Sequence, residues 1–163
     1  MATILVVGAS RGTGLETVRR ALAAGHRVRA LARSAAKIPI EDPNLEKITG
    51  DATDRTALVN ALEGVDAVIV TLGVPASLST ALSGTTLFST ATRALVDAMK
   101  EKGVRRLIAI TGIGAGESRG HGGPFYDWIA FPLLPKRVYD DKDLQEQIIR
   151  QSGLDWTIVR PGL

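Results

Sequence analysis

The sequence contains no cysteine and only two histidines among its 163 residues. Without cysteine the chain has no disulfide, no thiolate nucleophile and no cysteine ligand for a metal. The two histidines, His26 and His121, are far apart along the chain, and we therefore predict no metal site. Aromatic residues make up 4% of the chain and no basic stretch is interleaved with them, so nucleic-acid binding is not predicted either.

Long hydrophobic runs and a strong charge of one sign are also missing. No apolar run approaches the ~20 residues that a membrane span needs, and the first residues lack the basic and apolar regions of a secretory signal. The net charge is +3 and is spread along the chain. We expect a cytoplasmic protein that binds no membrane. Hydrophobic residues make up 45% of the sequence, enough for the core of one domain over residues 1–163.

The N-terminal stretch combines a strand, a glycine turn and a helix. Residues 4–7 form an apolar, mostly β-branched run without polar alternation, which is typical of a strand buried on both faces of a parallel sheet. Gly8, Gly12 and Gly14 follow with the spacing G-x-x-x-G-x-G. Residues 13–24 then show the apolar spacing of a helix. A glycine motif between a strand and a helix predicts a dinucleotide site.

Each of these glycines has a chemical reason. A pyrophosphate at a helix N-terminus meets free backbone N–H groups and the positive end of the helix dipole. Side chains in the turn would hold the phosphates away. We expect Gly8 to permit the tight turn, Gly12 to let the backbone approach the pyrophosphate, and Gly14 to let the helix lie close to the strand.

The rest of the chain alternates between strand and helix patterns. Asp54 is the expected N-cap of a helix that Gly64 ends. The prolines of residues 34–44 and the six glycines of residues 112–124 indicate loops. Further strands are expected over residues 26–33, 45–50, 65–72, 104–111 and 154–160, and long helices over about 85–102 and 138–151. This alternation predicts a doubly wound parallel sheet, a Rossmann fold, with strand order 3-2-1-4-5-6 and three α/β/α layers.

Ligands of such a sheet bind beyond the carboxyl ends of strands one and four. Parallel strands all end at the same edge, so residues at those ends are expected to gather around one ligand. The residues at or just after the predicted strand ends are Gly8, Arg33, Asp51, Leu72, Gly73, Thr111, Pro161 and Gly162.

The end of the second predicted strand favours NADP(H) over NAD(H). An NAD-preferring site has an acidic residue there, ~20 residues beyond the glycine turn, to bind the ribose hydroxyls. Here the strand ends in Arg33 and Ser34, and no acid follows until Glu41. A guanidinium binds a 2′-phosphate with charge-assisted hydrogen bonds, which a carboxylate would repel. Arg11, in the glycine turn, is expected to be a second cation at this ribose.

The chain resembles the short-chain dehydrogenase/reductase superfamily, and within it the small atypical branch of NmrA-like proteins and flavin/biliverdin-IXβ reductases. The resemblance covers essentially the whole chain. The matching stretches are VVGASRGTG (6–14), ALARS (30–34), GDATD (50–54), AVIVTLG (67–73), LIAITGIGAGESRGHGG (107–123), RVYDDKDLQE (137–146) and SGLDWTIVRPG (152–162).

The resemblance implies a bound NAD(P)(H). Asp51 would accept a hydrogen bond from the adenine amino group, although an Asp that simply forms the turn is the alternative. Thr111 and Pro161 would lie beside the nicotinamide. The full expected set of cofactor contacts is Gly8, Ser10, Arg11, Gly12, Thr13, Gly14, Arg33, Ser34, Asp51, Ala52, Leu72, Gly73, Thr111, Lys142, Pro161 and Gly162.

Two departures from the superfamily concern the proton donor. The acid/base pair of the superfamily is Tyr-x-x-x-Lys, whereas Tyr139 and Lys142 are separated by one residue fewer. If Lys142 is the lysine of the pair, Val138 occupies the tyrosine position. Related sequences often have serine after the position of Thr111, where this chain has Gly112. Thr111, Lys142 and Tyr139 remain the candidate catalytic residues.

These observations predict an NADPH-dependent reductase of a small conjugated or flavin-like acceptor, which draws its proton from water. One alternative is a non-catalytic NADP(H)-binding redox sensor of the NmrA-like kind. An epimerase or dehydratase ranks below both, because that chemistry needs the intact acid/base pair. We expect a monomer or a homodimer.

Two further expectations concern the nicotinamide end of the site. Residues 112–134 are expected to cover it as a lid, with a core helix or a dimer surface as the alternatives. Related sequences continue beyond the Pro161 and Gly162 turn, so we expect a C-terminal extension on the substrate side to be missing from this chain.

Overall fold

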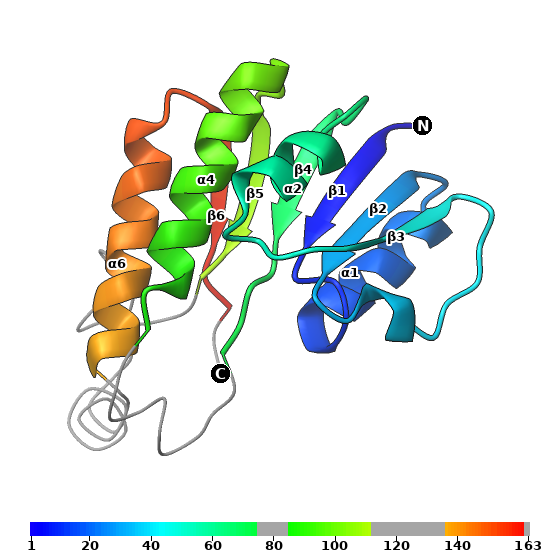
Figure 1. Cartoon of the computed structure of the whole chain (residues 1–163), viewed down its shortest axis with the longest axis horizontal. Coiled ribbons are helices and arrows are strands. Elements are labelled where there is room, and N and C mark those ends of the chain that lie inside the picture. The colour runs from blue at the N-terminus through cyan, green and yellow to red at the C-terminus, as the bar shows by residue number, and fades with distance from the viewer. Residues whose placement is uncertain (75–84, 112–135, 162–163) are drawn as a thin grey trace.

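The computed structural model describes residues 1–74, 85–111 and 136–161, with the backbone alone for residues 136–139. It contains a six-stranded sheet with the order β3-β2-β1-β4-β5-β6, and every neighbouring pair is parallel. The strands therefore point their carboxyl ends to one edge (Figure 1). The predicted fold class and strand order are confirmed. The expected lid, residues 112–134, lies outside the described residues, as does Gly162.

All the expected elements among the described residues are present. The strands are β1 (Thr3–Val7), β2 (Arg27–Ala32), β3 (Leu45–Thr49), β4 (Ala67–Val70), β5 (Arg106–Ile110) and β6 (Asp155–Val159). The helices are α1 (Gly12–Ala23), α2 (Arg55–Ala61), α4 (Leu87–Lys102) and α6 (Lys136–Gln151). The expected loop at residues 34–44 contains one 3₁₀ turn, η1 (Ala35–Lys37). Across all the residues that the structure describes, no helix is both long and apolar enough to cross a membrane.

Strands β4 and β5 begin later than the sequence predicted, because the first apolar residues of each run close the preceding helix. The N–H of Val104 donates to the carbonyl of Met99 at 2.9 Å, around Gly103, whose φ is +70°. The N–H of Val65, which follows Gly64 with its φ of +68°, donates to the carbonyl of Leu62, the C-cap residue of α2, at 3.2 Å. Both residues therefore belong to helix ends, which glycine in the left-handed conformation terminates.

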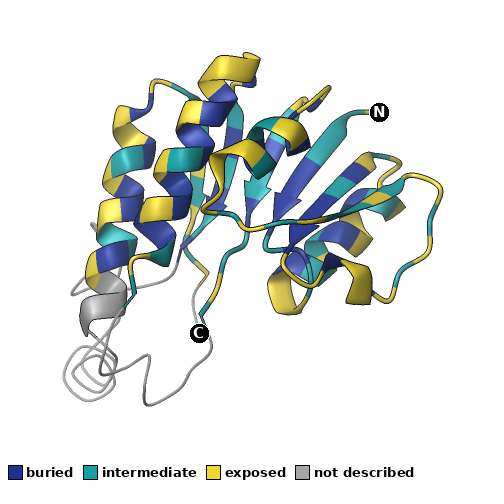
Figure 2. Cartoon of the chain, viewed as in Figure 1, coloured by how far each residue is buried: buried dark blue, intermediate teal, exposed yellow. Residues whose placement is uncertain are grey.

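The two faces of the sheet are covered by different helices. On one face, α2, α4 and α6 pack over Leu5, Val7 and the equivalent residues of β4 and β5. On the other, α1 and η1 pack over Val6 and its neighbours in β2. Strand β1 is consequently buried on both sides, as its apolar run predicted. Figure 2 shows the buried band through the sheet and the exposed outer surfaces of α4 and α6.

Carboxylates cap two helices that border the carboxyl edge. Asp54 Oδ1 accepts from the N–H of Thr56 at 2.8 Å, so the predicted N-cap of α2 is confirmed. The N-cap residue of α4, Thr86, makes no side-chain cap. The N–H of Leu87 donates to Oγ1 of Thr85 at 3.1 Å. The next two N–H groups donate to Oδ2 of Asp141 in α6, at 2.8 Å from Phe88 and 3.4 Å from Ser89. This buried carboxylate fixes the start of α4 against α6.

Helix α1 lies against the end of β1 at a distance that only glycine permits. A Cβ added at Gly14 would be 2.1 Å from the carbonyl oxygen of Gly8 and 2.6 Å from Oγ1 of Thr71. The first of these is a backbone atom and cannot move aside without shifting the turn. The predicted role of Gly14 in close helix–strand packing is therefore confirmed.

We predict that Gly14→Ala lowers the free energy of unfolding by about 3 kcal/mol, the upper range for overpacking a tight contact. Alanine would otherwise favour the helix by about 1 kcal/mol, so a loss isolates the steric effect. Urea unfolding measures it. Gly73→Ala is the control, because a Cβ there meets nothing within 4 Å, and its effect should stay within about 0.5 kcal/mol. Equal effects of the two substitutions would contradict the prediction.

Candidate functional site

A cleft of about 1040 Å³ lies at the carboxyl edge of the sheet. This is the size of a ligand site, typically roughly 300–1,000 Å³, and the edge is where doubly wound sheets bind ligands. Every strand end from β1 to β5 contributes to its wall, together with Pro161 after β6. The lining residues are Gly8, Ser10, Arg11, Gly12, Thr13, Leu31, Ala32, Arg33, Ser34, Lys37, Gly50, Asp51, Ala52, Thr53, Thr71, Leu72, Gly73, Val74, Leu87, Ile110, Thr111 and Pro161.

The glycine turn forms the floor of the cleft. Gly8 has φ +90° and Gly12 has φ +55°, conformations that other residues rarely adopt. A Cβ added at Gly12 would meet nothing within 4 Å, so this glycine leaves open space in front of the helix. The N-cap residue Arg11 makes no side-chain cap, and the first helical bond is from Leu15 to Arg11. Within the residues that the structure describes, the N–H groups of Gly12, Thr13 and Gly14 donate to no acceptor, and this geometry fits a pyrophosphate.

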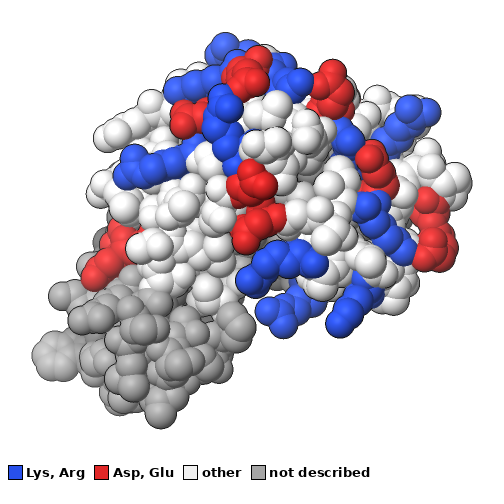
Figure 3. Space-filling model, viewed as in Figure 1, with Lys and Arg blue, Asp and Glu red and all other residues white. Residues whose placement is uncertain are grey.

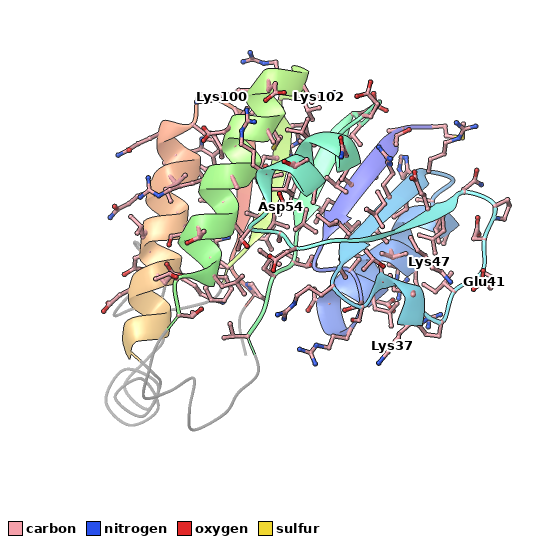
Figure 4. The ribbon with its side chains drawn as sticks, viewed as in Figure 1. Lys37, Glu41, Lys47, Asp54, Lys100 and Lys102 are labelled. Carbon is pink, nitrogen blue, oxygen red and sulfur yellow. The ribbon has the colours of Figure 1, made fainter. Side chains whose placement is uncertain are left out.

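Cations gather at the end of the cleft beside β2. Arg11, Arg33 and Lys37 all line it and all are exposed. Figure 3 shows positive side chains along the lower edge of the molecule, and Figure 4 places Lys37 there, below η1. The sequence analysis did not single out Lys37, because it treated residues 34–44 as an irregular loop. The sequence feature that could have identified Lys37 is its position three residues after Ser34. One 3₁₀ turn, η1, brings a residue at that spacing back to the end of β2.

Asp51 forms a turn at the end of β3. Its Oδ1 accepts from the N–H and from the hydroxyl of Thr53, each at 2.8 Å. These bonds, the backbone one foremost, lower the pKa of Asp51, and the nearby charge of Arg33 lowers it further. Asp51 is therefore a carboxylate at neutral pH. The turn occupies Oδ1 and leaves Oδ2 as the atom available to a ligand in the cleft.

The opposite end of the cleft, beside β5 and β6, contains a buried polar cluster. Thr111 lies in the cleft wall and is 5% exposed. Its hydroxyl donates to Oε1 of Glu146 at 2.8 Å. Arg160 donates from Nε to the same oxygen at 3.0 Å and from a terminal nitrogen to Oε2 at 2.5 Å. Lys142 donates from Nζ to the carbonyl of Thr111 at 2.9 Å. The Thr111 hydroxyl proton is thus engaged with a carboxylate.

Burial and charge act in opposite directions on this cluster. Burial raises the pKa of Glu146, but the hydrogen bonds from Arg160 and Thr111 and the charge of Arg160 outweigh it, so the pKa of Glu146 falls below its usual value. Burial lowers the pKa of Lys142, and the charge of Glu146 partly opposes this effect. Glu146 is therefore ionised at neutral pH, and its charge supports the ammonium of Lys142.

The expected site residues fall into three groups in the structure. Most of the expected cofactor contacts line the cleft. Gly14 lies behind the turn in α1, and Lys142 lies next to the cleft through its bond to Thr111. Tyr139 is in the first turn of α6, where only the backbone is described, and Gly162 lies outside the described residues. Within the described part of the chain, no group of three or more His, Asp or Glu side chains could hold a metal ion.

Comparison with known proteins gives the family. A family model described as NAD(P)H-binding matches residues 8–163. The chain belongs to this NAD(P)H-binding family, which confirms the family resemblance drawn from the glycine turn and the later motifs.

Curated relatives and a solved structure are consistent with this assignment. The chain is 32% identical over 98% of its length to sterol demethylase protein B of Methylococcus capsulatus, and 31% identical over 98% to an NAD(P)H azoreductase of Xenophilus azovorans. It spans 51% and 47% of these proteins, about half their length. Among solved structures, the anaerobillin reductase ChuY of Escherichia coli O157:H7 superposes with a TM-score of 0.73 at 26% identity, over 98% of this chain and 72% of that one.

Thr71 is a site residue that the sequence analysis missed. It follows β4, and its hydroxyl donates to the carbonyl of Val7 at 3.0 Å and to that of Gly8 at 3.3 Å. Its backbone N–H also donates to Val7, at 2.9 Å. Thr71 therefore ties the glycine turn to the neighbouring strand. A threonine at a strand end is common, and only its position beside the turn distinguishes it.

We predict that Thr71→Val lowers the free energy of unfolding by about 1 kcal/mol, the usual contribution of one hydrogen bond. Valine preserves the shape of threonine and removes only the hydroxyl donor. Thr71→Ser keeps the donor and is the matched control. Urea unfolding of the three proteins gives the comparison, and a serine variant that loses as much as the valine variant would show that the hydroxyl does not hold the turn.

Proposed function

We propose that the protein is an NADPH-dependent reductase of a small conjugated or flavin-like acceptor. The observation that carries this proposal is the cleft itself, with an open glycine turn on its floor and three cations at one end. The names of two similar proteins, an azoreductase and an anaerobillin reductase, support reduction as the chemistry.

The residues of the cleft fit NADP(H) from one end to the other. The free N–H groups of α1 would hold the pyrophosphate, and Oδ2 of Asp51 would accept from the adenine amino group. Arg33, Arg11 and Lys37 would bind the 2′-phosphate, which needs positive charge and hydrogen-bond donors. Thr111 and Pro161 would flank the nicotinamide. When bound, the nicotinamide supplies hydride to the acceptor.

The choice of acceptor follows from the cluster around Glu146. Thr111 donates its hydroxyl proton to a carboxylate that is ionised at neutral pH, so this hydroxyl does not protonate a substrate. The tyrosine position of the superfamily pair is held by Val138 if Lys142 is its lysine. An acceptor whose reduced form takes its proton from solvent needs neither group. Conjugated and flavin-like molecules are acceptors of this kind. Epimerisation and dehydration, in contrast, need a positioned acid or base of the protein.

The cofactor preference is tested with Arg33→Ala. We predict that this substitution weakens NADPH binding by about ten- to a hundredfold, because a charge-assisted hydrogen bond contributes roughly 1.5–3 kcal/mol. NADH binding should barely change, since NADH has no 2′-phosphate. Lys37→Ala should act in the same direction by up to about fivefold, the effect of an exposed ion pair. Fluorescence titration with each cofactor gives both dissociation constants.

Lys47→Ala is the matched control for these substitutions. Lys47 is on β3 and pairs with Glu41 at 2.5 Å, and Figure 4 labels both side chains. Lys47 is not among the residues that line the cleft. It should leave both affinities unchanged. Equal losses of NADPH and NADH affinity in Arg33→Ala, or tighter binding of NADH by the unmodified protein, would overturn the NADP(H) assignment.

The reaction is tested by following NADPH oxidation with a panel of acceptors: an azo dye, a free flavin, a quinone and an aldehyde. We predict turnover with at least one of the first three and none with the aldehyde, whose carbonyl reduction calls for a positioned acid. Tight NADPH binding without oxidation of NADPH above background would favour the redox sensor over the reductase.

A further inference from the structure

One carboxylate joins both walls at the nicotinamide end of the cleft. The side chain of Glu146 is 2% exposed and comes from the middle of α6. It accepts from Thr111, which follows β5 in one wall, and from Arg160, which precedes Pro161 in the other. Thr111 and Pro161 are the two residues expected beside the nicotinamide. Their separation therefore depends on a side chain that is itself outside the cleft.

The fold alone does not require a charge at this position. Strands β5 and β6 are already paired over five residues, and the N–H of Thr111 extends the pairing to Val159 at 2.9 Å. A buried ion pair also contributes little to stability, since well-packed apolar residues often do as well. The Glu146 carboxylate acts beyond the end of the ladder, where the two walls separate.

Helix α6 holds Thr111 at two atoms. Glu146 accepts from its hydroxyl, and Lys142, one turn earlier on the same face, donates to its carbonyl at 2.9 Å. The ammonium of Lys142 also lies 5.0 Å from the ring centroid of Phe88 on α4, a favourable cation–π distance. Lys142 and Glu146 of α6 thus both contact Thr111 in the cleft wall.

We propose that Glu146 is a positioning residue of the nicotinamide end: it fixes Thr111 against Arg160 and Pro161 and supplies the negative charge that supports Lys142 beside them. Glu146 does not touch the cofactor and acts through these neighbours. The inference rests on the proposed cofactor site and deepens it, because it names the residue that determines the geometry of that end.

The charge of Glu146 has a measurable effect on Lys142. Among the described residues, the charged and polar groups near Lys142 and Glu146 come from α6, α4, the end of β5 and the end of β6. They are Asp141, Arg150, Arg160, the Thr111 carbonyl and the Phe88 ring. Burial lowers the pKa of Lys142 and Glu146 opposes that effect. Replacing Glu146 by a neutral residue therefore lowers the pKa of Lys142 further, and the amine loses its proton at a lower pH.

The test compares Glu146→Gln with the unmodified protein and with Glu63→Gln. Glu63 forms an exposed ion pair with Lys102 at 2.5 Å outside the cleft, so it is a matched loss of one carboxylate. The first readout is the titration of the Lys142 side chain by NMR in protein without cofactor. We expect a lower midpoint in Glu146→Gln and an unchanged one in Glu63→Gln. A midpoint unchanged in Glu146→Gln would overturn the inference.

The second readout is the NADPH dissociation constant. Glu146→Gln should raise it about tenfold, the effect of losing one charge-assisted contact, and Glu63→Gln should leave it within about twofold. Glu146→Asp keeps the negative charge and shortens the side chain, so it distinguishes the effect of charge from that of hydrogen-bond geometry. It also provides the test if the glutamine variant does not fold. Its Lys142 midpoint should stay near that of the unmodified protein, but its NADPH affinity should fall, because the shorter side chain cannot bind Thr111 and Arg160 together.

The two proposals fail in different ways. If the unmodified protein binds no NADPH, the proposed function is wrong, and the Lys142 titration still decides whether Glu146 supports that ammonium. If the unmodified protein binds NADPH and both Glu146 variants bind it equally well, the cofactor site stands and the positioning role of Glu146 is wrong.

Discussion

The close approach of α1 to the ends of β1 and β4 is the constraint on which the cleft depends. It brings the N-terminal turn of the helix within reach of Gly8 and Thr71, where a Cβ at Gly14 would lie 2.1 Å from a backbone oxygen. The helix dipole and its free N–H groups act over a short range, within the first turn. If α1 lay further from the sheet, those N–H groups would no longer point into the cleft that the strand ends enclose. The hydroxyl of Thr71 and the positive φ of Gly8 serve the same contact from the other side.

The two ends of the cleft use opposite physical strategies. At the β2 end, Arg11, Arg33 and Lys37 are exposed, so their charges are open to an incoming anion and are partly screened by water and salt. At the β5 and β6 end, Glu146 is buried and hydrogen-bonded at both oxygens. A buried network of this kind holds one geometry, because any broken bond leaves an unsatisfied charge. The first end therefore suits recognition of a charged group, and the second suits placement of a reacting one.

The sequence predicted the features that short-range patterns encode. The apolar run of β1, the glycine turn, the Asp54 cap and the strand order all follow from local spacing and from the handedness of β-α-β connections. The residues it missed depend on contacts between distant parts of the chain. Thr71 meets Gly8 across a separation of 63 residues, and Glu146 meets Thr111 across 35. Lys37 was missed for a different reason, because a single 3₁₀ turn within an expected loop carries no periodic signal. β4 and β5 begin late because the first apolar residue of each run closes the preceding helix. The hydrophobic pattern alone does not show which apolar residues belong to the helix end and which to the strand.

The engagement of the Thr111 hydroxyl limits the chemistry of the site more than the spacing of Tyr139 and Lys142 does. Spacing can be compensated by a change in helix geometry, but a hydroxyl already donating to an ionised carboxylate has no proton left to give. To act as an acid, Thr111 would have to break its bond to Glu146, and the buried carboxylate would then lose one of its donors in a poorly solvated environment. The charge of that same carboxylate opposes the lowering of the Lys142 pKa by burial, so the two candidates are coupled through Glu146. The cluster thus supports the proposed acceptor, one that gains its proton from solvent.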